Sequence, residues 1–321
     1  MTTSSRPEGV KRRSVTLDGL LKAAALLTVV ISVLTALDTR QHFIELFSHF
    51  RPQYLLLSLL LLLTVLALRR QALYSLVLAF AVALNASYVV PWYAGADATA
   101  ASGEVKVLYA NVLGSNREHD RLLALIQREQ PDIVALLEIS SQWLETLESL
   151  QGDYPHSYTA PREDNFGVAL LSRMPLSGAT HVDSPPLGYP TILARFDVDG
   201  EAVTLIVTHP MIPVGADNFA ARNQQLQSIE EIVTATNGDL ILFGDLNASL
   251  WDRYYRHFED ATGLRNARRG HGILPTWPIF MPLAMIPIDH VLVSERFGIA
   301  DIRTGPRIGS DHLPLLVTVT R

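Results

Sequence analysis

Three long stretches without a charged residue constrain this chain more than any other feature of its sequence. They run from Ala23 to Leu37, from Pro52 to Leu68 and from Gln71 to Ala96. A membrane-crossing helix needs about 20 predominantly apolar residues, which is more than the core-facing elements of a soluble domain usually offer without a charge. The first third of the sequence therefore indicates helices that cross a membrane.

We predict a membrane domain of residues 1–96 with three transmembrane helices, over about residues 20–37, 53–68 and 72–93. The alternatives are buried core helices, a signal peptide in place of the first span, or two spans with a re-entrant hairpin. The second stretch reads LLSLLLLLTVLAL and has no polar face that could lie against water, which favours the bilayer.

Basic residues near the ends of these spans predict their orientation, because Lys and Arg accumulate on the cytoplasmic side. The loop from Asp38 to Gln53 holds only two basic residues, offset by two acidic ones, so we expect it outside. An odd number of spans then places everything after Trp92 on the periplasmic or extracellular side of a multi-pass inner-membrane protein. The residues expected on the cytoplasmic side are Arg6, Lys11, Arg12, Arg13, Lys22, Arg69 and Arg70.

Charge divides the chain at about residue 97. Nine of the 26 Lys and Arg, but only four of the 32 Asp and Glu, lie in residues 1–93, so the rest of the chain has a net charge of about −11. Tight, sequence-independent binding of nucleic acid normally needs a basic groove, which this balance does not favour. The chain has no cysteine, so disulfides do not indicate its compartment. We expect a linker at residues 97–104 and one domain at residues 105–321.

Strand-like and helix-like segments alternate in residues 105–321, which predicts an α/β domain with its own core. Helical periodicity occurs in HDRLLALIQREQ, in QWLETLESL and in Asp217–Thr236, where Phe219, Leu226, Ile229 and Val233 recur on one face. Eight apolar or β-branched runs predict strands: VKVLYANV, DIVALLEI, FGVALLSR, TILARFDV, AVTLIVTH, DLILFGDL, IDHVLV and LPLLVTV.

Polar side chains cluster where these predicted strands end or begin. Folds of the α/β class place their chemistry at strand ends. Any one of these residues could be a turn or capping residue, but so many at strand ends indicate a site. They are Asn111 after VLYA, Glu138 after IVALL, His209 after TLIVT, Asp245 and Asn247 after LILFG, Asp289 before HVLV, and Asp311 and His312 before LPLLVTV.

Seven short motifs, in order, resemble the endonuclease/exonuclease/phosphatase family, to which pancreatic-type deoxyribonuclease belongs. They are YANV, LLEI, NFGVALLSR, VTHP, GDLNAS, IDHVLV and GSDHLP, between about Val105 and Val319. GDLN followed by SDHLP is specific, and the complete series is more so. The resemblance implies a four-layer sandwich, with two β-sheets packed face to face and helices outside, and a metal-dependent phosphoesterase site at one edge.

The resemblance also implies a metal site. By position, Glu138 resembles the carboxylate that holds the essential divalent ion, with Asn111 beside it, and Asp311 resembles a further ligand of the metal or of water. Carboxylate and amide oxygens suit a hard cation such as Mg²⁺ or Mn²⁺, and the absence of cysteine speaks against a thiolate zinc site.

Five further residues resemble the family's catalytic positions. Asp245 and Asn247 match the pair that orients the attacking water and the scissile phosphate. His209 and His312 match the two histidines that flank this phosphate, and Asp289 matches the carboxylate that orients His312. A histidine held by a carboxylate keeps one tautomer and can take part in proton transfer near neutral pH.

Positions that would face the substrate depart from the family's pattern. Many members have an Arg before the Asp of the IDHVLV strand, whereas Pro287 and Ile288 stand here. The family's substrate-facing Tyr has only a loose counterpart in Tyr158. We assign Arg162 and Asn165 to substrate binding, with a solvated loop arginine as the alternative reading of Arg162.

The segment LPTWPIFMPLAMIPIDH, Leu274–His290, is unusually apolar for a neighbour of a polar site. It is either a Pro-rich loop that packs on the core or a lip that touches the membrane or an acyl chain. We expect a membrane-tethered, divalent-metal-dependent phosphodiesterase whose partners are the membrane and a phospholipid or nucleic acid, without a stable protein partner. The alternatives are a phosphomonoesterase that acts on a small phosphate and an inactive binding module.

Overall fold

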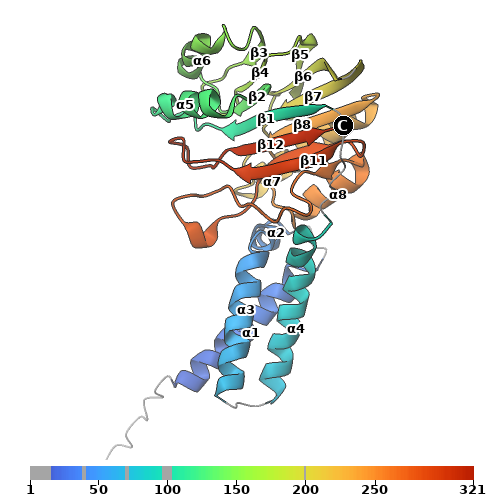
Figure 1. Ribbon diagram of the computed structural model, residues 1–321. Coiled ribbons are helices and arrows are strands. Elements are labelled where there is room, and N and C mark those ends of the chain that lie inside the picture. The colour runs from blue at the N-terminus through green and yellow to red at the C-terminus, as the bar shows by residue number, and fades with distance from the viewer. Residues whose placement is uncertain (1–15, 38–40, 69–71, 96–102, 199) are drawn as a thin grey trace, which may run out of the picture.

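The computed structural model describes residues 16–37, 41–68, 72–95, 103–198 and 200–321. Two β-sheets pack face to face with helices on their outer faces, and a group of apolar helices lies on one side of this domain (Figure 1). The predicted fold class, an α/β four-layer sandwich preceded by apolar helices, is confirmed.

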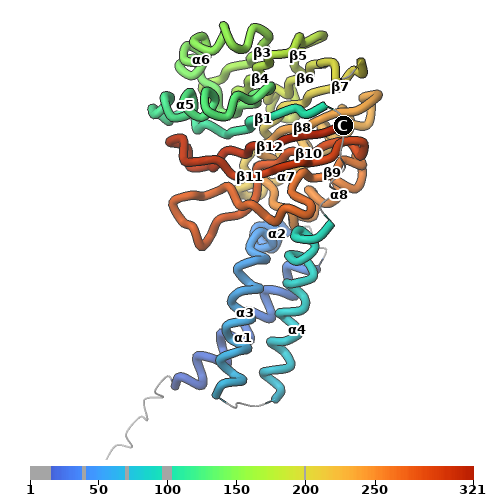
Figure 2. Tube along the Cα trace, viewed as in Figure 1, coloured from blue at the N-terminus to red at the C-terminus, as the bar shows by residue number. Residues whose placement is uncertain are grey.

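The first sheet has six strands in the order β11-β12-β1-β2-β4-β3. Only β1 and β2 are parallel, and the last strand of the chain, β12, returns antiparallel beside β1 (Figure 2). The strands are β1 (Glu104–Asn111), β2 (Ile133–Leu137), β3 (His156–Ala160), β4 (Val168–Ser172), β11 (Gly298–Thr304) and β12 (Leu315–Thr320).

The second sheet also has six strands, in the order β5-β6-β7-β8-β10-β9. Here only β7 and β8 are parallel, so the two central strands of each sheet form its parallel pair. The strands are β5 (Ser177–Ser184), β6 (Tyr189–Val198), β7 (Glu201–Thr208), β8 (Asp239–Asp245), β9 (Arg265–Asn266) and β10 (Asp289–Val293).

Apolar side chains fill the space between the sheets and the space under the flanking helices. α5 (His119–Glu129) and α6 (Ser141–Leu147) cover the first sheet, and α7 (Ala216–Ala235) and α8 (Arg253–Thr262) cover the second. The four residues of α7 that were predicted to share a face, Phe219, Leu226, Ile229 and Val233, are all buried.

Four helices precede the domain. α1 (Leu17–Leu34), α3 (Arg51–Ala67) and α4 (Ala72–Val89) share a small apolar core, and the short helix α2 (His42–Ser48) is bent by 69° from α3. By length and composition, two helices can cross a membrane, or three if α2 and α3 form one broken span. The orientation rests mainly on residues before position 16 and on Arg69 and Arg70, which lie outside the described residues, so it stays a prediction.

The N-terminal helices are packed onto the domain. After α4 a short helix, η1 (Val90–Tyr93), places Trp92 in the same apolar cluster as α7, α8 and the second sheet. The carbonyl oxygen of Trp92 accepts hydrogen bonds from the amides of Gly270 (3.1 Å) and Gly272 (2.8 Å). Most of the predicted linker, residues 97–102, lies outside the described residues, and β1 begins at Glu104. The domain therefore includes residues that precede that linker.

Replacement of Trp92 by Ala tests this attachment. Because Trp92 is 6% exposed, its removal should leave a cavity and lower the free energy of unfolding by about 3–5 kcal/mol. The full chain in detergent micelles should show a lower Tm by circular dichroism. The exposed neighbour Val90, changed to Ala, serves as the control, and an equal Tm for the two variants would show that Trp92 does not support the domain.

Candidate active site

Strand direction explains why residues far apart in the sequence meet at one edge of the sandwich. The parallel strands β1, β2, β7 and β8 end at this edge, and the antiparallel strands β4, β10 and β12 begin there. Asn111 and Asp245 are the last residues of β1 and β8, and Glu138 and His209 directly follow β2 and β7. Asn165 precedes β4, and Asp289 opens β10; His312 shortly precedes β12.

Glu138 is held by two donors. Its Oε1 accepts from the side-chain amide of Asn111 (2.9 Å), and its Oε2 accepts from the backbone amide of Gly114 (3.0 Å). The same Asn111 nitrogen lies 3.3 Å from Oδ2 of Asp245, so it bridges the two carboxylates. Burial raises the pKa of Glu138, and nearby Asp311 raises it further. The two hydrogen bonds act in the opposite direction but do not outweigh burial.

His312 is held by Asp289. Its Nδ1 lies 2.8 Å from Oδ2 of Asp289, and the other oxygen of that carboxylate accepts from the hydroxyl of Tyr109 (2.9 Å). Burial lowers the pKa of His312, but the carboxylates of Asp289 and Asp245 outweigh it and raise that pKa to about 10. Its other ring nitrogen, Nε2, therefore carries a proton and points toward Asp245 at 3.7 Å.

Asp245 lies between two histidines. Its Oδ2 is 3.6 Å from Nε2 of His209 and 3.7 Å from Nε2 of His312. Burial raises the pKa of Asp245 to about 8, with a further contribution from Asp289. Burial, together with the positive charge of His312, lowers the pKa of His209 to about 3, so this second histidine is neutral. Asn247 completes the group, with its side-chain nitrogen 3.5 Å from Nε2 of His209.

Several of these residues have left-handed backbone conformations. The φ angles are 62° for Glu138, 69° for Asn165 and 49° for Asn247. A residue other than glycine adopts this region at an energetic cost, and such residues concentrate at functional sites. The side-chain oxygen of Asn165 lies beside Gly114, where a Cβ atom would approach it to 2.7 Å, so this turn reaches the loop that holds Glu138.

The donor set fits a hard divalent cation. Oδ1 of Asp311 is buried without a hydrogen-bond partner among the described residues, while its Oδ2 accepts from the indole of Trp277 (2.9 Å). Asp245, Asp289 and His312 also place one possible ligand atom each within 4.8 Å of one another. Each of Glu138, Asp245 and Asp289 already accepts hydrogen bonds on both oxygens. Oδ1 of Asp311 is therefore the carboxylate oxygen with the most free capacity for a cation. The raised pKa values of Glu138 and Asp245 indicate that the charge of His312 does not offset their burial, and a cation would supply more positive charge.

Arg162 lies at the periphery of the site. Its guanidinium pairs with Asp164 and lies over the ring of Tyr189, 5.5 Å from the centroid. Tyr189 stacks on Phe166, and Phe166 contacts His209 with ring centroids 5.0 Å apart. Two aromatic rings thus separate Arg162 from the histidine, and they form an apolar wall that sequence reasoning missed.

Tyr158, the loose counterpart of the family's substrate-facing tyrosine, turns toward the other sheet. Its hydroxyl lies 2.8 Å from Nδ1 of His181 on β5. The fold does supply a buried arginine near Asp289: Arg268, in the loop after β9, is fully buried and its charge interacts with that carboxylate. Positions 287 and 288 hold no arginine, and no motif surrounds Arg268, so the sequence did not identify Arg268 as a site residue.

Residues outside the motifs fix the loop that carries Asn247. Arg222 of α7 is fully buried, and it donates to the carbonyl oxygen of Asn247 (3.1 Å) and to Oδ2 of Asp252 (3.0 Å). At the end of α2, Nδ1 of His49 lies 2.8 Å from the hydroxyl of Ser249. Helical periodicity could have marked Arg222 as a polar residue on a buried face, but it gives no partner.

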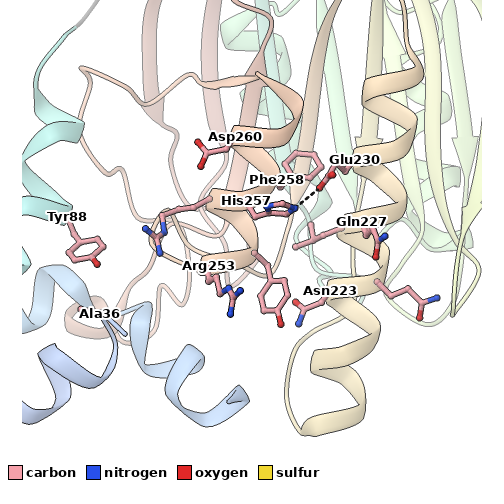
Figure 3. Close-up of a pocket in the computed structure, with 13 residues that line it drawn as sticks. Ala36, Tyr88, Asn223, Gln227, Glu230, Arg253, His257, Phe258 and Asp260 are labelled. Atoms are coloured by element: carbon pink, nitrogen blue, oxygen red, sulfur yellow. Dashed lines mark ion pairs between the residues drawn. The ribbon is translucent and has the colours of Figure 1, made fainter. Parts of the chain in front are cut away.

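A cavity of about 920 Å³ lies elsewhere. It opens between α7 and α8, next to Tyr88 of α4 and Ala36 at the end of α1 (Figure 3). Across it, His257 and Glu230 form an ion pair at 3.7 Å. None of the predicted site residues lines it, so it belongs to the seam between helices and domain.

Comparisons with known proteins show what this chain resembles in sequence and in fold. Residues 108–312 match the model of the endonuclease/exonuclease/phosphatase family. No curated protein matches the chain. Among solved structures, D. rerio TDP2 in complex with a single-strand DNA product is 15% identical, with a TM-score of 0.59 over 68% of this chain and 100% of that one.

Two other solved structures cover the same 68% of this chain. The endonuclease/exonuclease/phosphatase from Beutenbergia cavernae is 20% identical over 72% of its own chain, with a TM-score of 0.57. The human nocturnin catalytic domain with a bound sulfate anion is 20% identical over 93% of its own chain, with a TM-score of 0.55. At these identities the similarity shows the fold alone.

Replacement of Arg222 by Met tests whether the buried clamp supports the site loop. The change leaves Asp252 as a buried charge without its partner, which should lower the free energy of unfolding by about 3–5 kcal/mol. The matched control is Arg256→Met on α8, an exposed arginine whose loss should change stability by less than about 0.5 kcal/mol. Urea unfolding of the full chain in detergent measures both, and similar midpoints would contradict the clamp.

Proposed function

The chain belongs to the endonuclease/exonuclease/phosphatase family, and from this membership and the site geometry we propose a divalent-metal-dependent phosphodiesterase held at a membrane. One observation carries the proposal. The carboxylate of Asp245 lies within 3.7 Å of Nε2 of both His209 and His312, and Asp289 holds His312 in its protonated form. A base between one neutral and one cationic histidine suits attack of water on a phosphate ester.

Glu138 and Asp311, with Asn111 beside them, are proposed to hold Mg²⁺ or Mn²⁺. When bound, the ion would neutralise charge that develops on a phosphoryl oxygen and would favour ionised neighbouring carboxylates. Asn111 presents its nitrogen to Glu138 and its oxygen to the amide of Leu113, so its contribution here is to position Glu138.

The chain's own residues supply the remaining chemistry. Asp245 accepts a proton from the attacking water as the water oxygen bonds to phosphorus and the bond to the leaving oxygen breaks. His312 is cationic and donates from Nε2 toward the phosphoryl group, while Asp289 maintains its charge. His209 and Asn247 are neutral and orient the phosphate. The leaving oxygen then takes up a proton from solvent, and Asp245 releases the proton it accepted, so the net reaction adds one water across the ester bond.

A phosphodiester is the proposed substrate class, in a phospholipid headgroup or in nucleic acid. The structure of D. rerio TDP2 with a single-strand DNA product supports a diester on this fold. The acidic balance of the domain and its apolar helices favour a lipid. The proposed location is the inner membrane, with the catalytic domain on the periplasmic or extracellular side.

Hydrolysis of bis(p-nitrophenyl) phosphate by the full chain in detergent tests the activity. We expect hydrolysis with Mg²⁺ or Mn²⁺ and none with a chelator. Asp245→Ala and His312→Ala should each reduce the rate by at least about 10³-fold, because each removes a contact made in the transition state. Arg162→Ala should cost much less, since that side chain is peripheral.

Two results would contradict the mechanism: full activity in both variants, or hydrolysis that is insensitive to the chelator. Faster hydrolysis of p-nitrophenyl phosphate than of the diester would instead favour the phosphomonoesterase alternative. A binding module would hydrolyse neither compound. Unchanged circular dichroism spectra of the variants provide the control for folding.

Reporter fusions test the proposed orientation. Alkaline phosphatase fused after residue 100 should be active in a bacterial host, and a fluorescent protein that folds only in the cytoplasm should be dark there, because basic residues hold the other ends of the spans inside. The opposite pattern would place the catalytic domain in the cytoplasm. A fusion after residue 70, at the expected cytoplasmic turn, should give the reverse result and serves as the control.

A further inference from the structure

Exposed apolar side chains of the catalytic domain concentrate on two loops. Among the described residues from 103 onward, seven large apolar side chains are exposed, and five of them lie on the loop after β7 or on the loop before β10. Soluble surfaces seldom group such residues, so a group of them marks an interaction surface. The five are Ile212 (47% exposed), Val214 (67%), Phe280 (66%), Met281 (51%) and Leu283 (88%).

Both loops border the candidate active site. The loop after β7 starts at His209, and the carbonyl oxygen of Pro210 accepts from the side chain of Asn247 (3.0 Å). On the other side, the amide of Ile279 donates to the carbonyl oxygen of Asp311 (3.0 Å). The two loops therefore flank the catalytic group from the His209 side and from the His312 side.

The loop before β10 is closed at its base. Trp277 and Ile286 form an antiparallel bridge, and the segment between them carries Phe280, Met281 and Leu283. Figures 1 and 2 show this orange-red loop projecting from the domain toward the N-terminal helices. A closed base fixes the direction of the loop, so its apolar tip has a defined place relative to the helices.

α2 and the start of α3 lie next to the two loops. In α2, Phe43 and Phe47 lie one helical turn apart and are exposed, whereas Glu45 and Ser48 on the opposite face are buried. At the α2 end next to α7, the ring of His42 contacts Phe219 (6.2 Å between centroids). Beyond the other end of α2, the side chain of Gln53 on α3 donates to the carbonyl oxygen of Met285 (3.0 Å), in the loop before β10.

The angle between α2 and α3 indicates which surroundings the exposed face of α2 contacts. If α3 crosses a bilayer, a helix bent by 69° from it lies close to the bilayer plane, which is how interfacial amphipathic helices lie. We propose that α2 and the two loops form an apolar collar that rests in the bilayer crossed by the N-terminal helices, and that the catalytic site takes phosphodiester lipids from this bilayer. The collar comprises Phe43, Phe47, Ile212, Val214, Phe280, Met281 and Leu283.

The proposal for the substrate rests on the proposed phosphodiesterase function, whereas contact of the collar with the bilayer does not. Since the helices are packed onto the domain through Trp92, the collar is held at a fixed depth relative to the bilayer. A lipid headgroup in the same membrane is then present at high effective concentration, while nucleic acid must approach an acidic domain from solution.

Contact with the bilayer is tested without reference to activity. The chain has no cysteine, so Leu283→Cys and Val214→Cys each create one site for a fluorescent label. In proteoliposomes that contain lipids with nitroxide-labelled acyl chains, both labels should be quenched at least about twofold more than a label on the control Ser177→Cys. Ser177 is exposed and opens β5, at the end of that strand remote from the site. Equal quenching at the three positions would overturn the collar.

The substrate is tested with vesicles of phosphatidylglycerol and phosphatidylethanolamine. The unmodified protein should release headgroup phosphate, and the double variant Phe280→Asp, Leu283→Asp should lower the ratio of lipid rate to bis(p-nitrophenyl) phosphate rate by at least about tenfold. Val182→Asp, an exposed apolar residue of β5, is the control that should keep this ratio. An unchanged ratio in the collar variant would overturn the proposal.

Two further outcomes separate the proposals from each other. Rapid nicking of plasmid DNA without release of lipid phosphate would overturn the lipid substrate and identify a tethered nuclease. Absence of hydrolysis of the soluble diester by the unmodified protein would overturn the proposed function, and the labelling result alone would then decide whether the collar contacts the bilayer.

Discussion

Two buried carboxylates face each other across the ladder of β8 and β10, and much of the site is arranged around them. Asp245 and Asp289 are direct cross-strand partners, and both are almost fully buried. Like charges at such a position destabilise a sheet unless other groups compensate. His312 provides a cation between them, and the hydroxyl of Tyr109 provides a donor from the opposite sheet. Because these partners come from β1 and from the segment before β12, the site exists only when the two sheets are assembled.

The N-terminal helices belong to the same assembly. Oε1 of Glu45 accepts from the amide of Arg253 (2.5 Å) at the start of α8, and His49 reaches Ser249, two residues after Asn247. Trp92 fills the core beneath α7 and α8. A hydrophobic core loses stability when large side chains are removed, so a fragment that begins at β1 would lack part of its own interior. The helices therefore help to position the loop that carries Asn247.

Local sequence signals identified the interior of both sheets and missed their edges. The eight predicted strands are the eight inner strands, while β3, β5, β9 and β11 are the four edges. An inner strand is covered on both faces and reads as an apolar run; β5 alternates little and is mostly exposed. Polar residues at strand ends were likewise visible in the sequence. Tyr109, Arg222 and Arg268 were not, because their roles depend on partners more than 20 residues away.

The departure at Pro287 and Ile288 has a structural counterpart. Ile286 and Ile288 are both 5% exposed, and the carbonyl oxygen of Ile288 accepts from the amide of Leu246 (3.1 Å), next to Asp245. A charged side chain at either isoleucine would have to be buried without a partner, at a cost that packing alone could not offset. In this segment, apolar residues stand where the resemblance implies an arginine, and they form the base of the loop that carries Phe280 and Leu283. Apolar residues thus anchor the loop that borders the candidate site, next to the position where the resemblance implies an arginine.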